Sequence, residues 1–273
     1  IEGLKVACDR ALSLGCTSIN DAGIDAFEIG AYQSAAKLGV LKVRAYMMAD
    51  DELLEAILGV GLKTGFGNEL VKLGPLKIVF DGSMGARTAA MFEPYEDDPS
   101  TRGLLLIEVD ELKRRVREAH RNGLQVAIHA IGDRAIDIAL DAIEEAVRRK
   151  PWLGHRHRIE HAGYVLREQL ERMRRLGVCV SASIGFCHPV GDSHLDALGA
   201  HRMRGYYPMH SFSEHGIVAG GNSDGYGSNW AITGIHGCVT RKTMNGKILA
   251  KEEAIPVMDA IRVYTINGAY LEG

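Results

Sequence analysis

The chain has 273 residues, of which 46% are hydrophobic and 25% charged, and its formal net charge is −3. A chain of this size can bury one large core without disulfides, and 32 basic against 35 acidic residues lack the basic excess of a nucleic-acid binder. No apolar run approaches the ~20 residues that a membrane span requires, so composition excludes a membrane protein and favours a soluble globular protein that binds a small molecule.

The cysteines and the chain ends indicate the compartment and the extent of the sequence. The five cysteines form no CxxC pair, and their odd number argues against a disulfide framework, so we expect a reducing, cytoplasmic environment. The chain opens with Ile1 inside an amphipathic pattern, without the charged and apolar regions of a signal peptide. We therefore expect the natural N-terminus to be missing, and the C-terminus as well, since Gly273 follows a helix-like stretch directly.

The chain begins with a predicted helix and continues in strand-helix units. Apolar residues recur at helical spacing over residues 1–14, and Gly15 follows as a natural cap. A second helix is predicted over residues 26–38. A short strand rich in β-branched residues is predicted at residues 16–21, and buried strands are predicted at residues 41–48, 75–81, 124–129, 157–161, 178–183 and 217–222.

Alternation of strands and helices indicates a parallel sheet, because each crossover returns the chain to the same sheet end. A lone helix followed by about seven strand-helix units is the order of a TIM-type (β/α)8 barrel without its first strand. We thus predict one incomplete α/β barrel domain over residues 1–273. An open doubly wound sheet is the alternative, although no predicted strand is followed by a glycine-rich phosphate turn.

Ligand-type side chains stand where three predicted strands end. They are His129, His161 and Asp224. In a parallel barrel the carboxyl ends of the strands form the active site, so these side chains should face one mouth. Imidazole and carboxylate are usual ligands of zinc and similar divalent ions, and a catalytic ion keeps one position open for water. The pattern predicts a metal-dependent hydrolase.

Lys77 lies inside an apolar predicted strand, where a charged ammonium is costly to bury. One interpretation pairs it with a carboxylate such as Asp81. The other is reaction with CO2 to a carbamate, which removes the charge and supplies two oxygens to a metal. The residues alone leave both open.

The other histidines are weaker candidates. His155 and His157 precede or begin their strand, at the end of a barrel that serves stability, so we do not expect a metal pair there. A further group follows the strand at 178–183, and we expect it at the surface: His188, His194, His201 and His210.

Four segments together resemble the amidohydrolase superfamily, and in particular its YtcJ-like subgroup, which includes N-substituted formamide deformylase. They are residues 77–90 (KIVFDGSMGARTAA), 128–135 (IHAIGDRA), 158–162 (RIEHA) and 222–224 (NSD). The closing segment 264–269 (YTINGA) also resembles that family. The likeness spans nearly the whole chain and does not identify a substrate.

The resemblance implies a (β/α)8 barrel with one or two divalent metals, zinc being favoured. Lys77 would be carboxylated and bridge the metals, His129 and His161 would be ligands, and Asp224 would be ligand and proton carrier. The family's His-x-His pair and its β-sandwich have no counterpart here. We therefore expect at most one weakly held metal and little activity in this fragment, with self-association along the open edges near residues 16 and 217.

The reaction expected of the intact enzyme is hydrolysis of a C–N bond by metal-activated water. Arg87, Asp133 and Arg134 follow strand ends and could orient a polar substrate group, or they could form loop-stabilising salt bridges. Two rival functions are a non-catalytic binding or regulatory barrel and a hydrolase of ester or phosphoester bonds.

Overall fold

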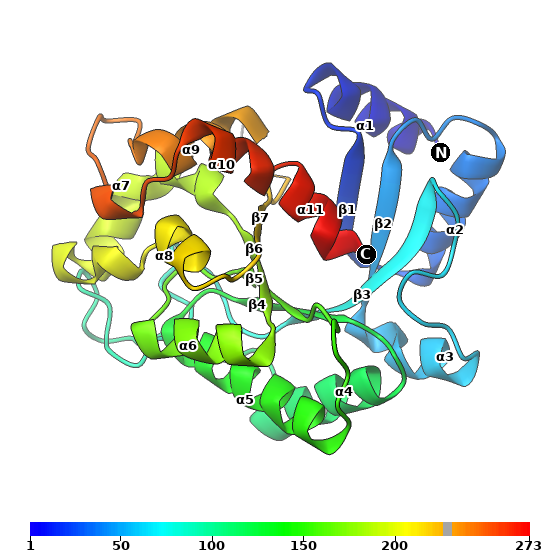
Figure 1. Cartoon of the computed structure of the whole chain (residues 1–273), viewed down its shortest axis with the longest axis horizontal. Coiled ribbons are helices and arrows are strands. Elements are labelled where there is room, and N and C mark those ends of the chain that lie inside the picture. The colour runs from blue at the N-terminus through cyan, green and yellow to red at the C-terminus, as the bar shows by residue number, and fades with distance from the viewer. Residues whose placement is uncertain (226–230) are drawn as a thin grey trace. The chain divides into compact units, whose positions relative to one another are not determined.

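A computed structural model describes residues 1–225 and 231–273, and strands alternate with helices along the chain (Figure 1). The described residues contain seven strands: β1 (Ser18–Ile24), β2 (Arg44–Asp50), β3 (Val71–Val79), β4 (Val126–Ala130), β5 (Arg158–His161), β6 (Cys179–Ala182) and β7 (Ala219–Gly221). They follow one another in the sheet in chain order. The predicted α/β class with parallel strands is confirmed.

This strand order also distinguishes between the two predicted architectures. A doubly wound sheet reverses its order at a switch point, whereas the strands of a barrel follow the chain around. No reversal occurs among the strands in the described parts of the chain. The order is that of a (β/α) barrel, and the doubly wound alternative is rejected.

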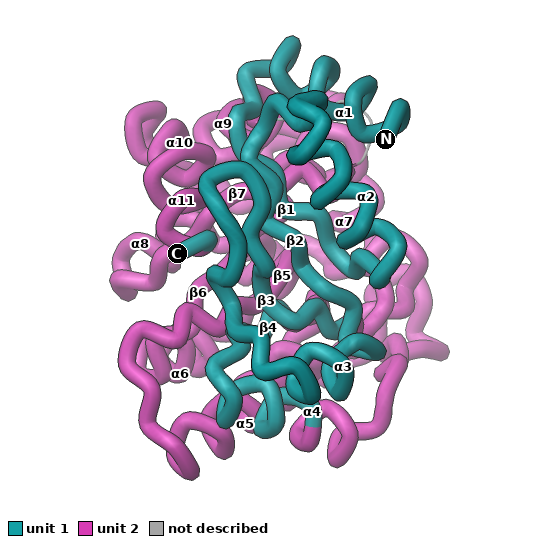
Figure 2. The backbone as a smooth tube through the Cα atoms, turned by 90° about the vertical axis from the view of Figure 1, so that its right-hand side faces the viewer, with its two compact units in different colours: residues 1–78, 115–127, 272–273 teal, residues 79–114, 128–271 magenta. Residues whose placement is uncertain are grey.

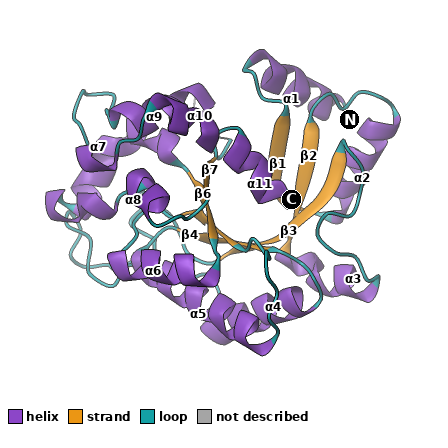
Figure 3. Cartoon of the chain, viewed as in Figure 1, coloured by secondary structure: helices purple, strands orange, loops and turns teal. Residues whose placement is uncertain are grey.

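The helices connect the strands (Figure 3). Within the described residues they are α1 (Glu2–Ser13), α2 (Ala26–Lys37), α3 (Leu54–Gly59), α4 (Val109–Arg121), α5 (Asp133–Arg149), α6 (Arg167–Leu176), α7 (Cys187–Leu198), α8 (Met209–Glu214), α9 (Ala231–Thr240), α10 (Val257–Val263) and α11 (Ile266–Glu272). The predicted helices over 1–14 and 26–38 correspond to α1 and α2. No helix in the described ranges is long and apolar enough to cross a membrane.

The chain divides into two compact units (Figure 2). Unit 1 comprises residues 1–78, 115–127 and 272–273, and unit 2 comprises residues 79–114 and 128–271. The prediction of one domain over the whole chain stays a prediction.

Unit 1 contains β1, β2 and most of β3. Helix α2 begins with a capping box, in which the Asp25 side chain accepts from the Glu28 amide and the Glu28 carboxylate accepts from the Asp25 amide. In the same helix, the buried Tyr32 hydroxyl donates to Asp21 of β1 at 2.6 Å. This bond ties the helix to the strand before it.

Unit 2 contains β5, β6 and β7 together with the last residues of β3 and β4. Helix α5 buries Ile136, Ala139, Leu140 and Ile143, which recur at helical spacing on one face. Every residue of β5 and β6 is buried. These strands therefore read as continuous core segments, and only their ends can present polar groups to solvent or to a ligand.

Candidate functional site

Two of the predicted ligand residues lie side by side in unit 2. His129 belongs to β4 and His161 is the last residue of β5. Their ring centroids are 4.4 Å apart, with an angle of 66° between the ring planes. The structure therefore brings together the two imidazoles that the strand-end pattern predicted at one mouth.

The His129 ring is held through Nε2. This nitrogen lies 3.0 Å from the backbone carbonyl oxygen of Gly82 and 3.4 Å from the Asp81 carboxylate. Because a carbonyl oxygen can only accept, Nε2 carries the hydrogen and donates it. The lone pair of the neutral ring is then on Nδ1.

The His161 ring is held through its other nitrogen. Nδ1 lies 2.7 Å from the Ser183 hydroxyl, which donates its hydrogen to Asn222 Oδ1 at 2.7 Å. The Asn222 amide donates in turn to the carbonyl and hydroxyl oxygens of Ser181, at 2.8 and 2.9 Å. A hydroxyl has one hydrogen, so Nδ1 of His161 must be the donor to Ser183 and the lone pair is on Nε2.

The backbone at His161 supports this arrangement. His161 and the following Ala162 have φ angles of 69° and 49°, in the left-handed region that non-glycine residues seldom occupy. Such strain persists only where surrounding contacts determine the conformation, and it is concentrated at functional sites. The left-handed turn at the end of β5 sets the direction in which this imidazole leaves the strand.

Asp81 is a residue of this site that the sequence analysis considered only as a partner for Lys77. Its side chain is fully buried and accepts hydrogen bonds from the backbone amides of Ile131, Gly132 and Ala90, at 3.0, 2.9 and 3.0 Å. Burial raises the pKa of Asp81 to about 7, and the three backbone donors oppose that rise. Nothing in the local sequence indicates these partners.

Asp224 follows β7 by three residues and is exposed, with a φ angle of 52°. Its negative charge contributes to the raised pKa of the buried Tyr207, for which burial is the larger cause. The predicted role of Asp224 as a ligand and proton carrier stays a prediction.

Lys77 belongs to unit 1, where it is only 8% exposed and stands opposite Asp50 of β2 in the parallel register. A lysine so placed is costly to keep charged unless a carboxylate pairs with it or a reaction removes its charge. Carboxylation of Lys77 and its pairing with Asp81 both stay predictions.

The donor set bears on whether a metal fits. Among residues 1–225 and 231–273, no group of three or more His, Cys, Asp or Glu side chains is placed to hold a metal ion. The two imidazoles nevertheless have the features of ligands, since each is fixed by a hydrogen bond at one nitrogen and carries its lone pair on the other. They fit part of a metal site.

The predicted substrate-binding residues have structural contacts. Arg87 pairs with Asp97 and donates to the carbonyl oxygen of Gly85 at 2.8 Å. Asp133, which is 4% exposed, accepts from the Phe92 amide at 3.0 Å, and Arg134 is exposed. The contacts of Arg87 and Asp133 are of the loop-stabilising kind, and a role of these residues in binding substrate stays a prediction.

His155 and His157 lie where a structural role was expected. Both are buried and their rings stack at 4.3 Å, just before β5. Nε2 of His155 donates to the carbonyl oxygen of Leu176 at 2.9 Å. These contacts pack the strand's beginning against the end of α6.

The surface placement predicted for His194 is wrong, whereas His201 and His210 are exposed as predicted. His194 lies on the buried face of α7, in a segment interpreted as a surface connection, and its Nδ1 is 2.9 Å from the Tyr206 hydroxyl. Burial, helped by the charge of Arg87, lowers the pKa of His194 to about 4.

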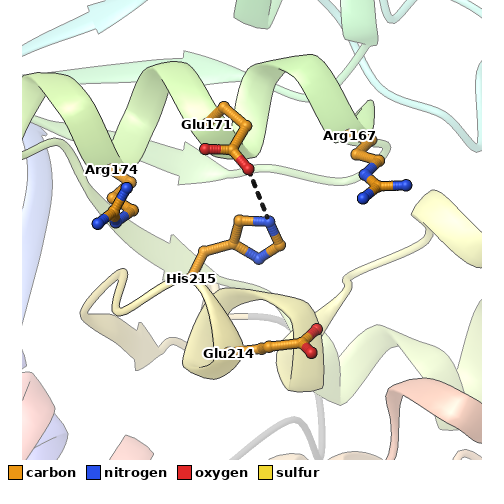
Figure 4. A pocket seen from close by; sticks show the side chains of 5 residues that line it. All are labelled: Arg167, Glu171, Arg174, Glu214 and His215. Carbon is orange, nitrogen blue, oxygen red and sulfur yellow. Dashed lines mark ion pairs between the residues drawn. The ribbon is translucent and has the colours of Figure 1, made fainter.

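A shallow groove between α6 and α8 is a separate candidate (Figure 4). It has a volume of about 370 Å³ and is lined by Arg167, Glu171, Arg174, Glu214 and His215. His215 Nε2 lies 3.6 Å from the Glu171 carboxylate. The lining carries both signs of charge and includes none of the predicted site residues.

Comparison with known proteins supplies a family context. The model of the Amidohydrolase family matches residues 2–273. The putative amidohydrolase YtcJ of Bacillus subtilis is 32% identical over 243 residues, which are 88% of this chain and 45% of that protein. N-substituted formamide deformylase of Arthrobacter pascens is 27% identical over 282 residues, covering 100% of this chain and 51% of the relative.

A solved structure supports the fold. The crystal structure of an uncharacterized metal-dependent hydrolase from Pyrococcus horikoshii superposes with a TM-score of 0.87 at 32% identity, covering 98% of this chain and 54% of that one. The predicted incomplete (β/α) barrel is confirmed by this similarity. The chain spans about half the length of the curated relatives it matches.

Proposed function

The chain belongs to the amidohydrolase family, and from this premise we propose that it is part of a metal-dependent hydrolase that cleaves the C–N bond of an amide or cyclic amide. The substrate is a small molecule, and the name of the Arthrobacter pascens relative suggests N-substituted formamides as a first class to test. The observation that carries the proposal is a pair of neighbouring imidazoles at strand ends, each held in one tautomer by a hydrogen bond: His129 with its hydrogen on Nε2 and His161 with its hydrogen on Nδ1.

The ligand assignment follows from these tautomers. His129 would bind a divalent ion, zinc in our proposal, through Nδ1, and His161 would bind it through Nε2, because these nitrogens carry the lone pairs. Lys77, as a carbamate, and Asp224 would complete the set. Their assignment rests on the sequence.

The chain's own residues then have distinct tasks. A bound divalent ion would lower the pKa of water towards ~7 and polarise a carbonyl oxygen. Gly82 and Ser183 keep the two rings in the tautomers that bind. Asp224 would accept the proton of the attacking water and deliver it to the leaving amine, as a carboxylate beside the reacting atoms can do.

Zinc titration tests the proposal on the chain as it exists. We expect calorimetry to show at most one bound zinc ion. Zinc should also raise the melting temperature, because it increases the free energy of unfolding by about 2.7 kcal/mol at a free zinc concentration of 100 times Kd. His129→Ala and His161→Ala should each weaken binding at least about tenfold. The matched control is His210→Ala, an exposed histidine of α8, which should leave binding unchanged.

Two outcomes would contradict the assignment. One is a zinc affinity that stays unchanged in each of the single variants His129→Ala and His161→Ala. The other is equal weakening by His210→Ala, which would indicate nonspecific binding to surface histidines. A screen of the longer protein against formamides, carboxylic esters and phosphoesters then separates amide hydrolysis from the ester and phosphoester alternatives, and lack of turnover in a zinc-binding protein would favour a binding barrel.

A further inference from the structure

Both oxygens of the Asp81 carboxylate are occupied by donors. Oδ1 accepts from the Ile131 amide at 3.0 Å and lies 3.4 Å from Nε2 of His129. Oδ2 accepts from the amides of Ala90 and Gly132 at 3.0 and 2.9 Å. We propose that Asp81 is a positioning residue, which acts with the Gly82 carbonyl oxygen to hold His129 in the tautomer that presents Nδ1 to a metal; the metal part of this inference rests on the proposed function.

A carboxylate is the one side chain of this size that satisfies all these partners. An ionised carboxylate is acceptor-only, whereas an amide would place its NH2 group against a backbone N–H on whichever side it turned. Asp81 is fully buried, so a mismatched donor could not turn to water instead. Every described neighbour within hydrogen-bonding distance of the two oxygens is a donor, and this geometry fits the ionised form.

The backbone segments at Ala90 and Gly132, which both donate to Asp81, are packed too closely against each other to move apart easily. A Cβ at Gly132 would meet the Ala90 carbonyl oxygen at 2.0 Å, which shows how tightly these two segments approach each other. Arg134 reinforces the contact, since its amide donates to the same Ala90 oxygen at 3.2 Å. Asp81 thus joins three segments: the end of β3, the loop at Ala90 and the turn that starts α5.

The effect on His129 is electrostatic as well as geometric. Nε2 faces two acceptors, the Gly82 carbonyl oxygen at 3.0 Å and the Asp81 carboxylate at 3.4 Å. Both favour the hydrogen on Nε2 and so leave the lone pair on Nδ1. A carboxylate beside the ring N–H also makes an imidazole ligand more basic, which strengthens its bond to a metal.

Nitrogen-15 NMR of the metal-free protein at about pH 8 reads the tautomer of a neutral imidazole directly. We expect His129 in the Nε2–H form and His161 in the Nδ1–H form, with the resonances assigned by His129→Gln and His161→Gln. Asp81→Asn should shift His129 towards the Nδ1–H form, leave His161 unchanged, and weaken zinc binding about 10- to 100-fold.

The matched control is Glu253→Gln, the same change from carboxylate to amide. Glu253 is also buried and accepts from the backbone amide and the hydroxyl of Ser211, at 2.9 and 2.6 Å. Its loss should lower stability while leaving the tautomers of His129 and His161 and the affinity for zinc unchanged. A purely structural role of Asp81 would instead give the same pattern for both variants.

The outcomes separate this inference from the proposed function. A wild-type His129 in the Nδ1–H form would overturn the positioning role, and this result does not depend on whether Asp81→Asn folds. An unchanged His129 tautomer in Asp81→Asn would also overturn it. If wild-type protein binds no zinc but Asp81→Asn still switches the His129 tautomer, the positioning role stands and the metal assignment falls.

Discussion

Ser183 connects a candidate ligand to the neighbouring strand, and its removal tests that connection. The hydroxyl is 1% exposed and makes two hydrogen bonds of 2.7 Å, to His161 Nδ1 and to Asn222 Oδ1. At about 0.5–1.5 kcal/mol for each bond, Ser183→Ala should lower the free energy of unfolding by about 1–3 kcal/mol. Because His161 would lose the hydrogen bond that fixes its ring, Ser183→Ala should also weaken zinc binding about 10- to 100-fold.

Urea unfolding and zinc calorimetry measure the two effects. Ser181→Ala is the control, because Asn222 bonds both the Ser181 hydroxyl and the Ser181 backbone carbonyl oxygen, and the second bond survives the substitution. We expect a loss of about 0.5 kcal/mol or less and unchanged zinc affinity for this variant. Equal effects of the two substitutions on zinc affinity would refute the bridging role of Ser183.

Three further predictions concern unit 2 and a control in unit 1. Arg241 is fully buried and donates to three backbone carbonyl oxygens, so Arg241→Lys should cost about 2–4 kcal/mol in urea unfolding; a loss under ~1 kcal/mol would contradict this. Gly132→Ala should lower the free energy of unfolding by about 1–3 kcal/mol, because the added Cβ would clash with the Ala90 carbonyl oxygen. Its control is Gly30→Ala in α2, where an added Cβ has no atom within 4 Å, and this substitution should raise the melting temperature. The folded-state pKa of His194, about 4, lies below its ordinary value of 6.5, so the unfolded chain binds more protons than the folded protein between pH 4 and pH 6.5. The free energy of unfolding should therefore fall by up to about 3 kcal/mol as the pH drops from 6.5 to 4. His194→Gln should abolish this pH dependence.

The parts of the site that the sequence predicted depend on local patterns. An apolar strand and the polar residue that ends it are contiguous in sequence, so His129 and His161 could be located at strand ends without knowing their neighbours. Parallel strands bring those ends to one edge of the sheet. The same reasoning failed for His194, because whether the segment after β6 runs over the surface or folds into α7 with a buried face depends on packing against distant residues.

The sequence by itself determined the α/β class, the parallel strand order and the two imidazoles, since hydrophobic periodicity and strand-end chemistry are local properties. Only the tertiary structure decided which nitrogen of each imidazole carries the hydrogen, and which residues hold it there. Asp81 bonds the amide of Ile131 across 50 positions, and Ser183 bonds His161 and Asn222 across 22 and 39 positions. Hydrogen bonds require atoms to meet within about 3 Å, and between residues so far apart in the chain that meeting is decided by packing alone.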